Sequence, residues 1–257
     1  MHYVDSHIHL SDKYYQKYHK IIFDYMRQAN VQSICVSEDF NSSVEALSLK
    51  EKFFKDSDLL RIFVGIHPQF AAVSSDLQLF ESLVQSKHDY IDGIGEIGLD
   101  PTYANLDPDN TQKRQKIVFE KMLDLAETND MPVSLHSRRS VNEILEILPS
   151  YEIRNAVFHW YDGNKSNLKR INDKGYFVSF GPYLLYSNDK HTLLKESDIN
   201  LILIETDGPV KYKNCFDGTL TSPSLVVTIV YFASLLLKKS FDELSEILYE
   251  NSTRFVN

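Results

Sequence analysis

The stretch YVDSHIH at residues 3–9 decides the fold, because it is a short apolar run that ends in two histidines. Alternate residues of a β-strand point to the same face, so His7 and His9 face the same way, with Asp5 beneath them. Such a pair at a strand end can hold a metal ion, but two histidines on one face of a core strand also arise by chance. The same combination of an apolar run and a polar end recurs along the chain, which favours a metal site over a chance pair.

Short runs rich in Ile, Val, Leu and Phe alternate with helical segments over the whole sequence. Short continuous apolar strands are typical of a parallel sheet that is covered on both faces. Eight of them in a chain of 257 residues predict a single-domain (β/α)₈ TIM barrel over residues 1–257, with a doubly wound open sheet as the alternative. The expected strands are Tyr3–His7, Ser33–Ser37, Arg61–Ile66, Gly93–Ile97, Val133–His136, Ala156–His159, Tyr176–Phe180 and Leu201–Glu205.

The clearest helix is expected over Pro108–Asn129, where apolar residues fit one face. Another is expected to begin at Ser222-Pro223, an N-cap followed by proline at the first helical position. The last helix, Phe241–Val256, is expected to pack under the final turn of the ring. The apolar run Leu225–Leu237 is too short to span a bilayer, which predicts no membrane partner.

Polar residues of metal-binding type fall at the C-terminal ends of these expected strands. Each has an ordinary alternative when taken alone: a turn carboxylate between glycines, a core histidine or an N-cap aspartate. The carboxyl ends of barrel strands form one ring where active sites are built, so the residues together predict a site for one or two divalent ions. Imidazole and carboxylate ligands suit Zn²⁺, Mn²⁺ or Fe²⁺ and suit Mg²⁺ less well, and the motifs do not choose among them. The candidate ligands are His7, His9, Glu96, His136, His159 and Asp207.

Two further carboxylates are expected to support the ligands from a deeper layer. Glu205 lies two residues before Asp207 and points the same way, and Asp5 holds the corresponding place beneath His7. A buried carboxylate needs a partner, and the free ring nitrogen of a metal-binding histidine is a natural one.

Three residues near the strand ends are candidates for binding a substrate. His67 could contact a phosphate oxygen, and Arg138 could hold a phosphate through two hydrogen bonds. Trp160, followed by Tyr161, could stack on a base or a sugar. The alternatives are a packed turn histidine, a solvated loop arginine and rim aromatics that only fill space.

Composition sets limits on the function. The net charge of −9 argues against a generally basic nucleic-acid binder, although it does not exclude a nuclease, because bound metal ions supply local positive charge. Cys35 and Cys215 lie far apart and form no CxxC pair, which predicts free thiols in a reducing compartment such as the cytoplasm. The first residues contain no apolar stretch of the signal-peptide type, so none is expected.

The motifs VDSHIHL, VGIHP, IGEIGLD, PVSLHSR, FHWYDG and LIETDGP resemble, in order and spacing, those of the TatD family of metal-dependent deoxyribonucleases in the amidohydrolase superfamily. The resemblance covers essentially the whole chain. It implies a TIM barrel with two divalent ions (Zn²⁺, Mn²⁺ or Mg²⁺) that cleaves DNA phosphodiesters, often from the 3′ end. Asp207 and Glu96 would be the catalytic carboxylates. The resemblance places His7, His9, Glu96 and Asp207 around one ion and lets Glu96 bridge to a second ion held by His136 and His159.

The chain departs from the family pattern in loops that would face a substrate. Gln69 follows the GIHP motif where the family commonly has a second histidine, Trp160-Tyr161 replaces a Cys-Phe type pair, and the sequence before the last barrel helix also differs. These departures resemble a divergent branch, similar to the QatD-like proteins of anti-phage operons. The expected partners are therefore DNA, single-stranded or with free ends, and proteins of such an operon.

Two other functions remain open from the sequence. One is a different hydrolysis at the same site, of an amide, a lactone or a D-aminoacyl-tRNA ester. The other is a metal-binding subunit of an anti-phage assembly, although the intact ligand set argues against a dead enzyme.

Overall fold

The computed structural model describes residues 1–72, 76–106, 109–213 and 217–257. Pro108 and Cys215, which were named above, lie outside the described residues. Cys35 is a buried free thiol.

Eight parallel strands follow one another around a single sheet in chain order, and the first and last strands also meet. Asp207 N–H donates to His7 O at 2.8 Å, and His9 N–H donates to Gly208 O at 2.8 Å, so the ring closes at the carboxyl ends of β1 and β8. The predicted TIM barrel is confirmed, and the open sheet is wrong. The strands are β1 Tyr3–Ile8, β2 Val31–Val36, β3 Leu60–Val64, β4 Gly93–Gly98, β5 Val133–His136, β6 Ala156–Phe158, β7 Phe177–Phe180 and β8 Ile202–Ile204.

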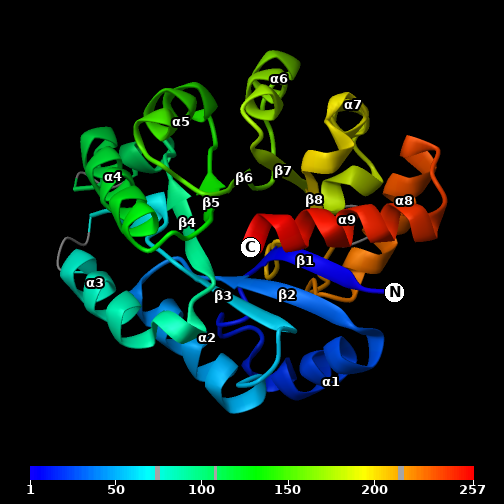
Figure 1. The fold of residues 1–257 in the computed structure, drawn as a ribbon, viewed down its shortest axis with the longest axis horizontal. Coiled ribbons are helices and arrows are strands. Elements are labelled where there is room, and N and C mark those ends of the chain that lie inside the picture. The colour runs from blue at the N-terminus through cyan, green and yellow to red at the C-terminus, as the bar shows by residue number, and fades with distance from the viewer. Residues whose placement is uncertain (73–75, 107–108, 214–216) are drawn as a thin grey trace.

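Helices cover the outside of the ring (Figure 1). The α-helices are α1 His19–Ala29, α2 Phe40–Phe53, α3 Asp76–Lys87, α4 Gln112–Thr128, α5 Val141–Ile147, α6 Lys165–Asp173, α7 Asn188–Glu196, α8 Leu225–Leu237 and α9 Phe241–Val256. Short 3₁₀ turns occur at Gln16–Tyr18, Pro68–Phe70, His88–Tyr90, Tyr103–Asn105, Leu148–Ser150, Pro182–Leu185 and Ile199–Leu201.

Two expected helix starts lie too early in the sequence. The helix expected from Pro108 begins at Gln112, because the side chain of Thr111 caps it by accepting from Arg114 N at 3.1 Å. The predicted N-cap Ser222 does not cap α8, which begins after Ser224; the two serine hydroxyls hydrogen-bond to each other at 2.6 Å instead.

The last helix, α9, lies beside β1 and β8 and closes the amino-terminal end of the barrel (Figure 1). Asn155, just before β6, donates to Arg254 O at 2.9 Å and so fixes the end of α9 at this side. The Phe255 ring is fully buried and lies 5.6 Å from the rings of both Phe63 and Phe177. These residues belong to an apolar cluster inside the barrel with Ile34, Val36, Val157 and Leu203.

Glycines let β4 approach β5 closely. A Cβ on Gly98 would lie 2.0 Å from His136 O, and one on Gly95 would lie 2.7 Å from the Cβ of Ser134. Side chains at these places would push the two strands apart. The glycines on either side of Glu96 therefore bring that carboxylate against His136 on the neighbouring strand.

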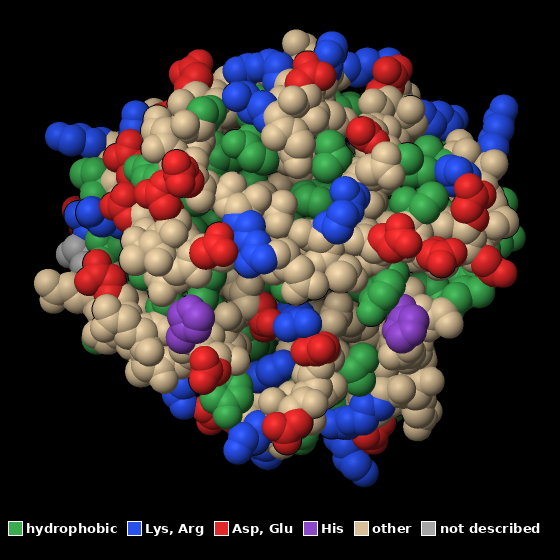
Figure 2. Space-filling view, in the orientation of Figure 1, with side chains coloured by type: hydrophobic (Ala, Val, Ile, Leu, Met, Phe, Trp, Pro, Cys, Tyr) green, Lys and Arg blue, Asp and Glu red, His purple; other side chains and the backbone are tan. Residues whose placement is uncertain are grey.

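Within the part of the chain that the structure describes, no helix combines the length and the apolar character needed to cross a membrane. Acidic and basic side chains are intermixed over the side of the molecule drawn in Figure 2. That side offers no continuous basic face of the kind that grips duplex DNA.

We predict that Phe255→Ala lowers the free energy of unfolding by about 3–5 kcal/mol, because it removes a large buried ring and leaves a cavity at the end of the barrel. Urea unfolding of the variant and the parent protein measures the difference. Thr253→Ala, an exposed position on the same helix, serves as the control and changes stability by less than about 0.5 kcal/mol. A loss below about 1 kcal/mol in Phe255→Ala would show that α9 is not needed to seal the barrel.

Candidate metal centre

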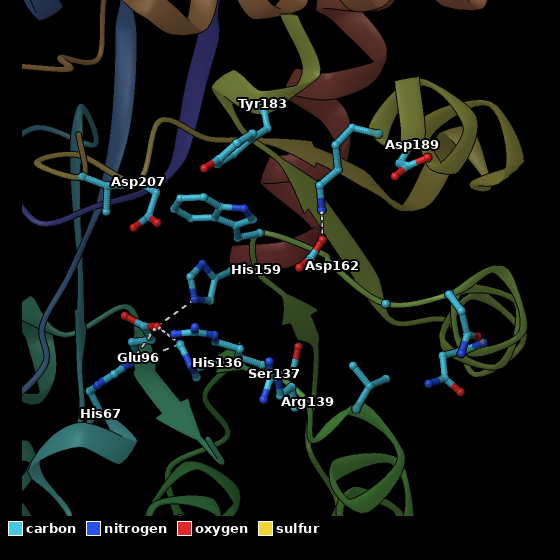
Figure 3. Close-up of a pocket in the computed structure, with 18 of the residues that line it drawn as sticks. His67, Glu96, His136, Ser137, Arg139, His159, Asp162, Tyr183, Asp189 and Asp207 are labelled. Carbon is cyan, nitrogen blue, oxygen red and sulfur yellow. Dashed lines mark hydrogen bonds and ion pairs between the residues drawn. The ribbon is translucent and has the colours of Figure 1, made fainter. Parts of the chain in front are cut away.

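The carboxyl ends of five strands bring all the predicted ligands together. Figure 3 shows four of them around one end of the cavity: Glu96, His136, His159 and Asp207. His7 and His9 come from the end of β1, Glu96 from β4, and Asp207 follows β8. His136 ends β5 and His159 follows β6. His136 is partly buried, and the others are no more than 8% exposed, so their polar groups must find partners among themselves or in a bound ligand.

Glu96 stands between two groups of histidines, and each of its oxygens faces one group. Oε2 lies 3.5 Å from His7 Nε2 and 3.6 Å from His9 Nε2. Oε1 lies 2.6 Å from His136 Nδ1 and 2.7 Å from His159 Nε2. This is the arrangement that a carboxylate needs in order to reach two ions at once.

Asp207 completes the first group. Its Oδ1 lies 3.4 Å from His9 Nε2 and 3.7 Å from His7 Nε2, and the two Nε2 atoms are 3.3 Å apart. His7, His9 and Asp207 therefore place three ligand atoms within 4.8 Å of one another. The backbone of Asp207 is in the left-handed region, with φ 48°, and this turns its carboxylate back over the ring of strand ends.

His9 and His136 each have one imidazole nitrogen that points away from the cluster. The hydrogen bond made by that nitrogen shows that the other nitrogen is the one able to bind a metal ion. His9 Nδ1 lies 3.0 Å from Val36 O, which can only accept, so Nδ1 carries a proton and Nε2, which faces the cluster, is the nitrogen that a metal ion would bind after displacing the proton there. His136 Nε2 lies 2.9 Å from Asp100 Oδ2, which leaves Nδ1 for the cluster. A metal-binding histidine typically donates its other N–H to a carboxylate or a carbonyl in this way, so these donors fit a divalent ion.

His67 is close to the second group but has the opposite tautomer. Its Nδ1 accepts from Gln69 N–H at 3.1 Å, so the proton of the neutral ring is on Nε2. That Nε2 lies 3.4 Å from Glu96 Oε1 and 3.1 Å from His136 Nδ1. Distance alone would group His67 with Glu96 and His136 as ligands, but the tautomer makes it a hydrogen-bond donor. Burial lowers the pKa of His67, and the charge of Glu96 opposes that shift.

The two deeper carboxylates accept hydrogen bonds from backbone N–H groups and from hydroxyls. Asp5 Oδ1 accepts from Thr206 N at 2.9 Å and from the main-chain N–H of His7 at 3.4 Å, so it ties β1 to the segment after β8. The His7 ring has Ser134 Oγ as its partner instead, at 3.1 Å. Burial raises the pKa of Asp5 to about 8.

Glu205 Oε1 accepts from Trp160 N at 2.8 Å, and its other oxygen accepts from Ser179 Oγ. His159 Nδ1 lies 3.8 Å from Glu205 Oε1 and makes no hydrogen bond to any residue that the structure describes. Distance also groups Glu205 with His7 and His159 as a candidate metal site. Because both Glu205 oxygens are already engaged, we favour the Glu96 groups as the ion sites.

Close contact between histidines and carboxylates shifts the pKa values of the cluster. Burial of the His9 ring opposes its charged form, but the hydrogen bond to Asp207 and the charges of Glu38, Glu96 and Asp207 raise its pKa to about 9. Burial also opposes the charged form of Glu96, yet the charges of His67 and His159 and the hydrogen bonds of His136 and His159 hold its pKa well below its usual range. Without a bound cation, protons on histidines thus balance the buried carboxylate.

A cavity of about 990 Å³ opens above the cluster. Arg138 lines it with an exposed side chain whose Nη1 lies 3.9 Å from Asp100 Oδ2. Trp160 lines it too, and its ring lies 5.4 Å from that of Tyr183 and 5.5 Å from that of Tyr212. Tyr161 does not reach the cavity as a stacking surface, because its side chain is 1% exposed and its hydroxyl donates to Asn164 O.

Several residues near the site were not predicted from the sequence. Asp100 lies in the same IGEIGLD motif as Glu96, and its position there was the available signal. Glu38 follows β2 and lines the cavity, as an acidic residue at a strand end could have suggested. Ser134, Tyr183 and Tyr212 carry no such signal, because serines and tyrosines are common in cores and loops.

Comparison with known proteins gives a consistent picture. The family model described as TatD related DNase matches residues 4–257. An uncharacterized metal-dependent hydrolase, MJ1582 of Methanocaldococcus jannaschii, is 26% identical over 256 residues, which cover 98% of this chain and 96% of that protein. Human deoxyribonuclease TATDN3 is 26% identical over 217 residues, covering 80% and 77% of the two chains. The crystal structure of YjjV, a TatD homologue from Escherichia coli, superposes with a TM-score of 0.88 at 23% identity, covering 98% and 97% of the chains, and supports the fold.

We predict that Asp100→Asn weakens binding of a divalent ion about 10- to 100-fold at the position next to His136, because the ring loses the carboxylate that fixes its tautomer. Titration of the metal-free protein against a coloured chelator, with Zn²⁺ or Mn²⁺, measures the affinity of each equivalent. Asp173→Asn, which removes a carboxylate from the outside of α6, is the control. Equal affinities in the two variants would rule out a role for Asp100 in holding the ring.

We also predict that ion binding at pH 7 releases protons. The raised pKa of His9 means that the metal-free site holds a proton which a metal ion must displace, so affinity increases with pH up to about 9 and then levels off. Calorimetry with Mn²⁺ in buffers of different ionisation enthalpy counts the protons. His191→Gln, a change at a ring bonded only to Leu184 O, leaves that count unaltered. Binding without proton release at pH 7 would mean that His9 is neutral in the metal-free protein.

Proposed function

Because the chain belongs to the family of TatD-related DNases, we propose that it is a divalent-metal-dependent hydrolase that cleaves phosphodiester bonds of DNA. The observation that carries the proposal is the position of Glu96, whose two oxygens face two separate histidine groups. A carboxylate in that place suits two ions, with His7, His9 and Asp207 around one and His136 and His159 around the other.

Bound ions would supply charge that lowers the pKa of water and neutralises the phosphoryl oxygens during an in-line displacement. Asp207 would orient the attacking water and take its proton, since its carboxylate faces the cavity beside His9. Glu96 would hold the two halves of the site at a fixed separation. Asp100 would keep Nδ1 of His136 directed at the site by accepting from Nε2.

The roles of the substrate-binding residues are assigned from the hydrogen bonds, charge or stacking surface that each side chain offers. His67 offers its Nε2–H toward the centre, where it suits an oxygen of the scissile phosphate. Arg138 at the rim can hold a phosphate through two hydrogen bonds. Trp160, backed by the rings of Tyr183 and Tyr212, offers a surface on which an unstacked base could lie.

A strand end is the substrate that fits these features best. The site lies within a cavity and not in a long basic groove, and the chain carries a net charge of −9. Affinity for duplex DNA depends on many phosphate contacts, which an acidic surface disfavours. We therefore propose digestion of single-stranded or frayed DNA from an end, the 3′ end by resemblance. A reducing compartment such as the cytoplasm suits the free thiol of Cys35.

We predict that the protein with added Mn²⁺, Zn²⁺ or Mg²⁺ releases mononucleotides from an end-labelled single strand and leaves a covalently closed circle intact. The comparison of the two substrates by gel, with the label at either end, measures both preference and polarity. Rapid nicking of the circle without mononucleotide release would refute digestion from an end. Cleavage of neither substrate, together with activity on an ester or amide panel, would favour the alternative hydrolase.

We predict that Glu96→Ala abolishes hydrolysis and lowers metal content while the protein stays folded, because both ion positions lose a ligand. His136→Ala empties mainly one position and leaves about one ion bound. Metal analysis after reconstitution, with circular dichroism as the folding control, tests both. We expect the reconstituted parent protein to hold two ions, about 3.5–4 Å apart as is typical of two-metal sites. At most one equivalent in the reconstituted parent would contradict the bridging role.

A further inference from the structure

The cavity continues past the candidate ligands onto a wall that the proposed reaction does not use. This wall is formed by the loops after β5 and β6 and by the first residues of α5 and α6. Arg139, in the loop after β5, is labelled in Figure 3. At about 990 Å³, the cavity is at the upper end of the usual range for ligand pockets and exceeds what one phosphate requires. The wall residues are Arg139, Asn142, Asn164 and Asn167.

The three asparagines on the wall have their oxygens occupied and their amide nitrogens free. Arg170 Nη1 donates to Asn142 Oδ1 at 2.7 Å and to Asn167 Oδ1 at 3.3 Å. Asn164 Oδ1 accepts from the main-chain N–H of Asn167 at 2.8 Å. Among the described residues, no acceptor is within hydrogen-bond distance of the three Nδ2 groups. The wall thus offers hydrogen-bond donors, and its ligand must supply acceptors.

Arg139 adds a positive charge to these donors. Its guanidinium makes no ion pair or hydrogen bond with another described residue. Its φ is 58°, in the left-handed region. Of the described non-glycine residues with positive φ, three follow the ends of α1, α4 and α8, and the rest, Arg139, Trp160 and Asp207, all line the cavity. Unfavourable backbone angles that persist away from helix ends cluster at binding sites.

Carboxylates on another part of the cavity narrow the place where an anion can lie. Asp162 and Asp189 also line it. Lys190 Nζ lies 2.8 Å from Asp162 Oδ1 and offsets that charge, and Asp189 is exposed to solvent. Asp189 would therefore repel an anion, which would bind instead beside Arg139 and the asparagines.

We propose that Arg139 and the three asparagine amides form a subsite for a second phosphate of the strand, the one next to the scissile phosphate. A phosphodiester has only acceptor oxygens and carries one negative charge, which matches a wall of donors with one arginine. The assignment rests on the proposed function, since it takes the other phosphate to lie at the metal centre. It makes a chain of at least two phosphates the preferred ligand.

The test measures binding of the single-stranded oligonucleotide dT₆ to the full-length protein in EDTA, so that the strand is not cut. Trp160 is the one tryptophan in the sequence and lines the cavity, so its fluorescence reports binding there. Arg139→Gly removes the charge at a backbone position that glycine adopts without strain. Asn164→Asp keeps the oxygen that caps α6 and replaces the donor with a negative charge. Arg154→Ala, which removes an arginine from the loop before β6, is the matched control.

We expect Arg139→Gly to reduce the slope of log affinity against log salt by about 0.7, the value for one phosphate contact on a single strand. Asn164→Asp weakens dT₆ binding about tenfold or more, and Arg154→Ala changes neither quantity. A dT₆ analogue with neutral methylphosphonate linkages binds the parent and Arg139→Gly equally.

Equal salt slopes in Arg139→Gly and Arg154→Ala would overturn the subsite, as would a loss in Arg139→Gly that persists with the neutral analogue. The result is separable from the proposed reaction. If DNA is cut with added metal and the slopes do not differ, the reaction stands and the subsite falls. If no metal supports cutting but Arg139→Gly still lowers the slope, the subsite stands and the reaction falls.

Discussion

A buried carboxylate is the constraint on which the rest of the site depends. Glu96 is 3% exposed, and taking its charge out of water is costly unless positive groups surround it. The close approach of β4 to β5, permitted by Gly95 and Gly98, brings His136 to it. The ring closure between β1 and β8 brings His7 and His9 from the other side. The barrel therefore assembles cationic partners around Glu96, and protonated histidines and divalent ions compete for that place.

The interior of the barrel has two layers, an apolar one near the amino-terminal ends of the strands and a polar one near their carboxyl ends. Near the amino-terminal ends, apolar side chains fill the space and Phe255 of α9 seals it, so this layer contributes stability by burial. Near the carboxyl ends, the same strands supply histidines and carboxylates that mutual contacts satisfy only in part. His159 Nδ1, for example, has no hydrogen-bond partner in the described part of the chain. The stable layer lets the barrel carry a polar layer that would be hard to hold alone.

The fold and the convergence of the ligand candidates could be predicted from the sequence. Both follow from the alternation of side chains along a strand and from the position of the polar residues at the strand ends. Strands of period two fix which residues share a face, and the barrel gathers their ends. The finer arrangement could not be read this way. Tautomers depend on individual hydrogen bonds that periodicity does not reveal: the N–H of Gln69, in the turn just after His67, fixes the His67 tautomer, and Asp100, just after the neighbouring strand, fixes that of His136. Asp5 was expected to hold the His7 ring, but that ring faces Ser134, which lies 127 residues away in sequence. The start of α4 lies later than expected because the side chain of Thr111 caps the helix there.

Asp100 links the ion-binding part of the site to its substrate rim. One oxygen accepts from His136 Nε2 and lies 3.9 Å from Arg138, while the other accepts from Thr102, so the carboxylate is held in place. Hydrogen bonds from His136 and Thr102 hold the pKa of Asp100 below its usual range despite burial, which keeps it negative. A charge shared between a metal-directed histidine and a phosphate-directed arginine orients both at once. In the proposed reaction, the carboxylate that directs the His136 ring would therefore also help to set where the strand lies.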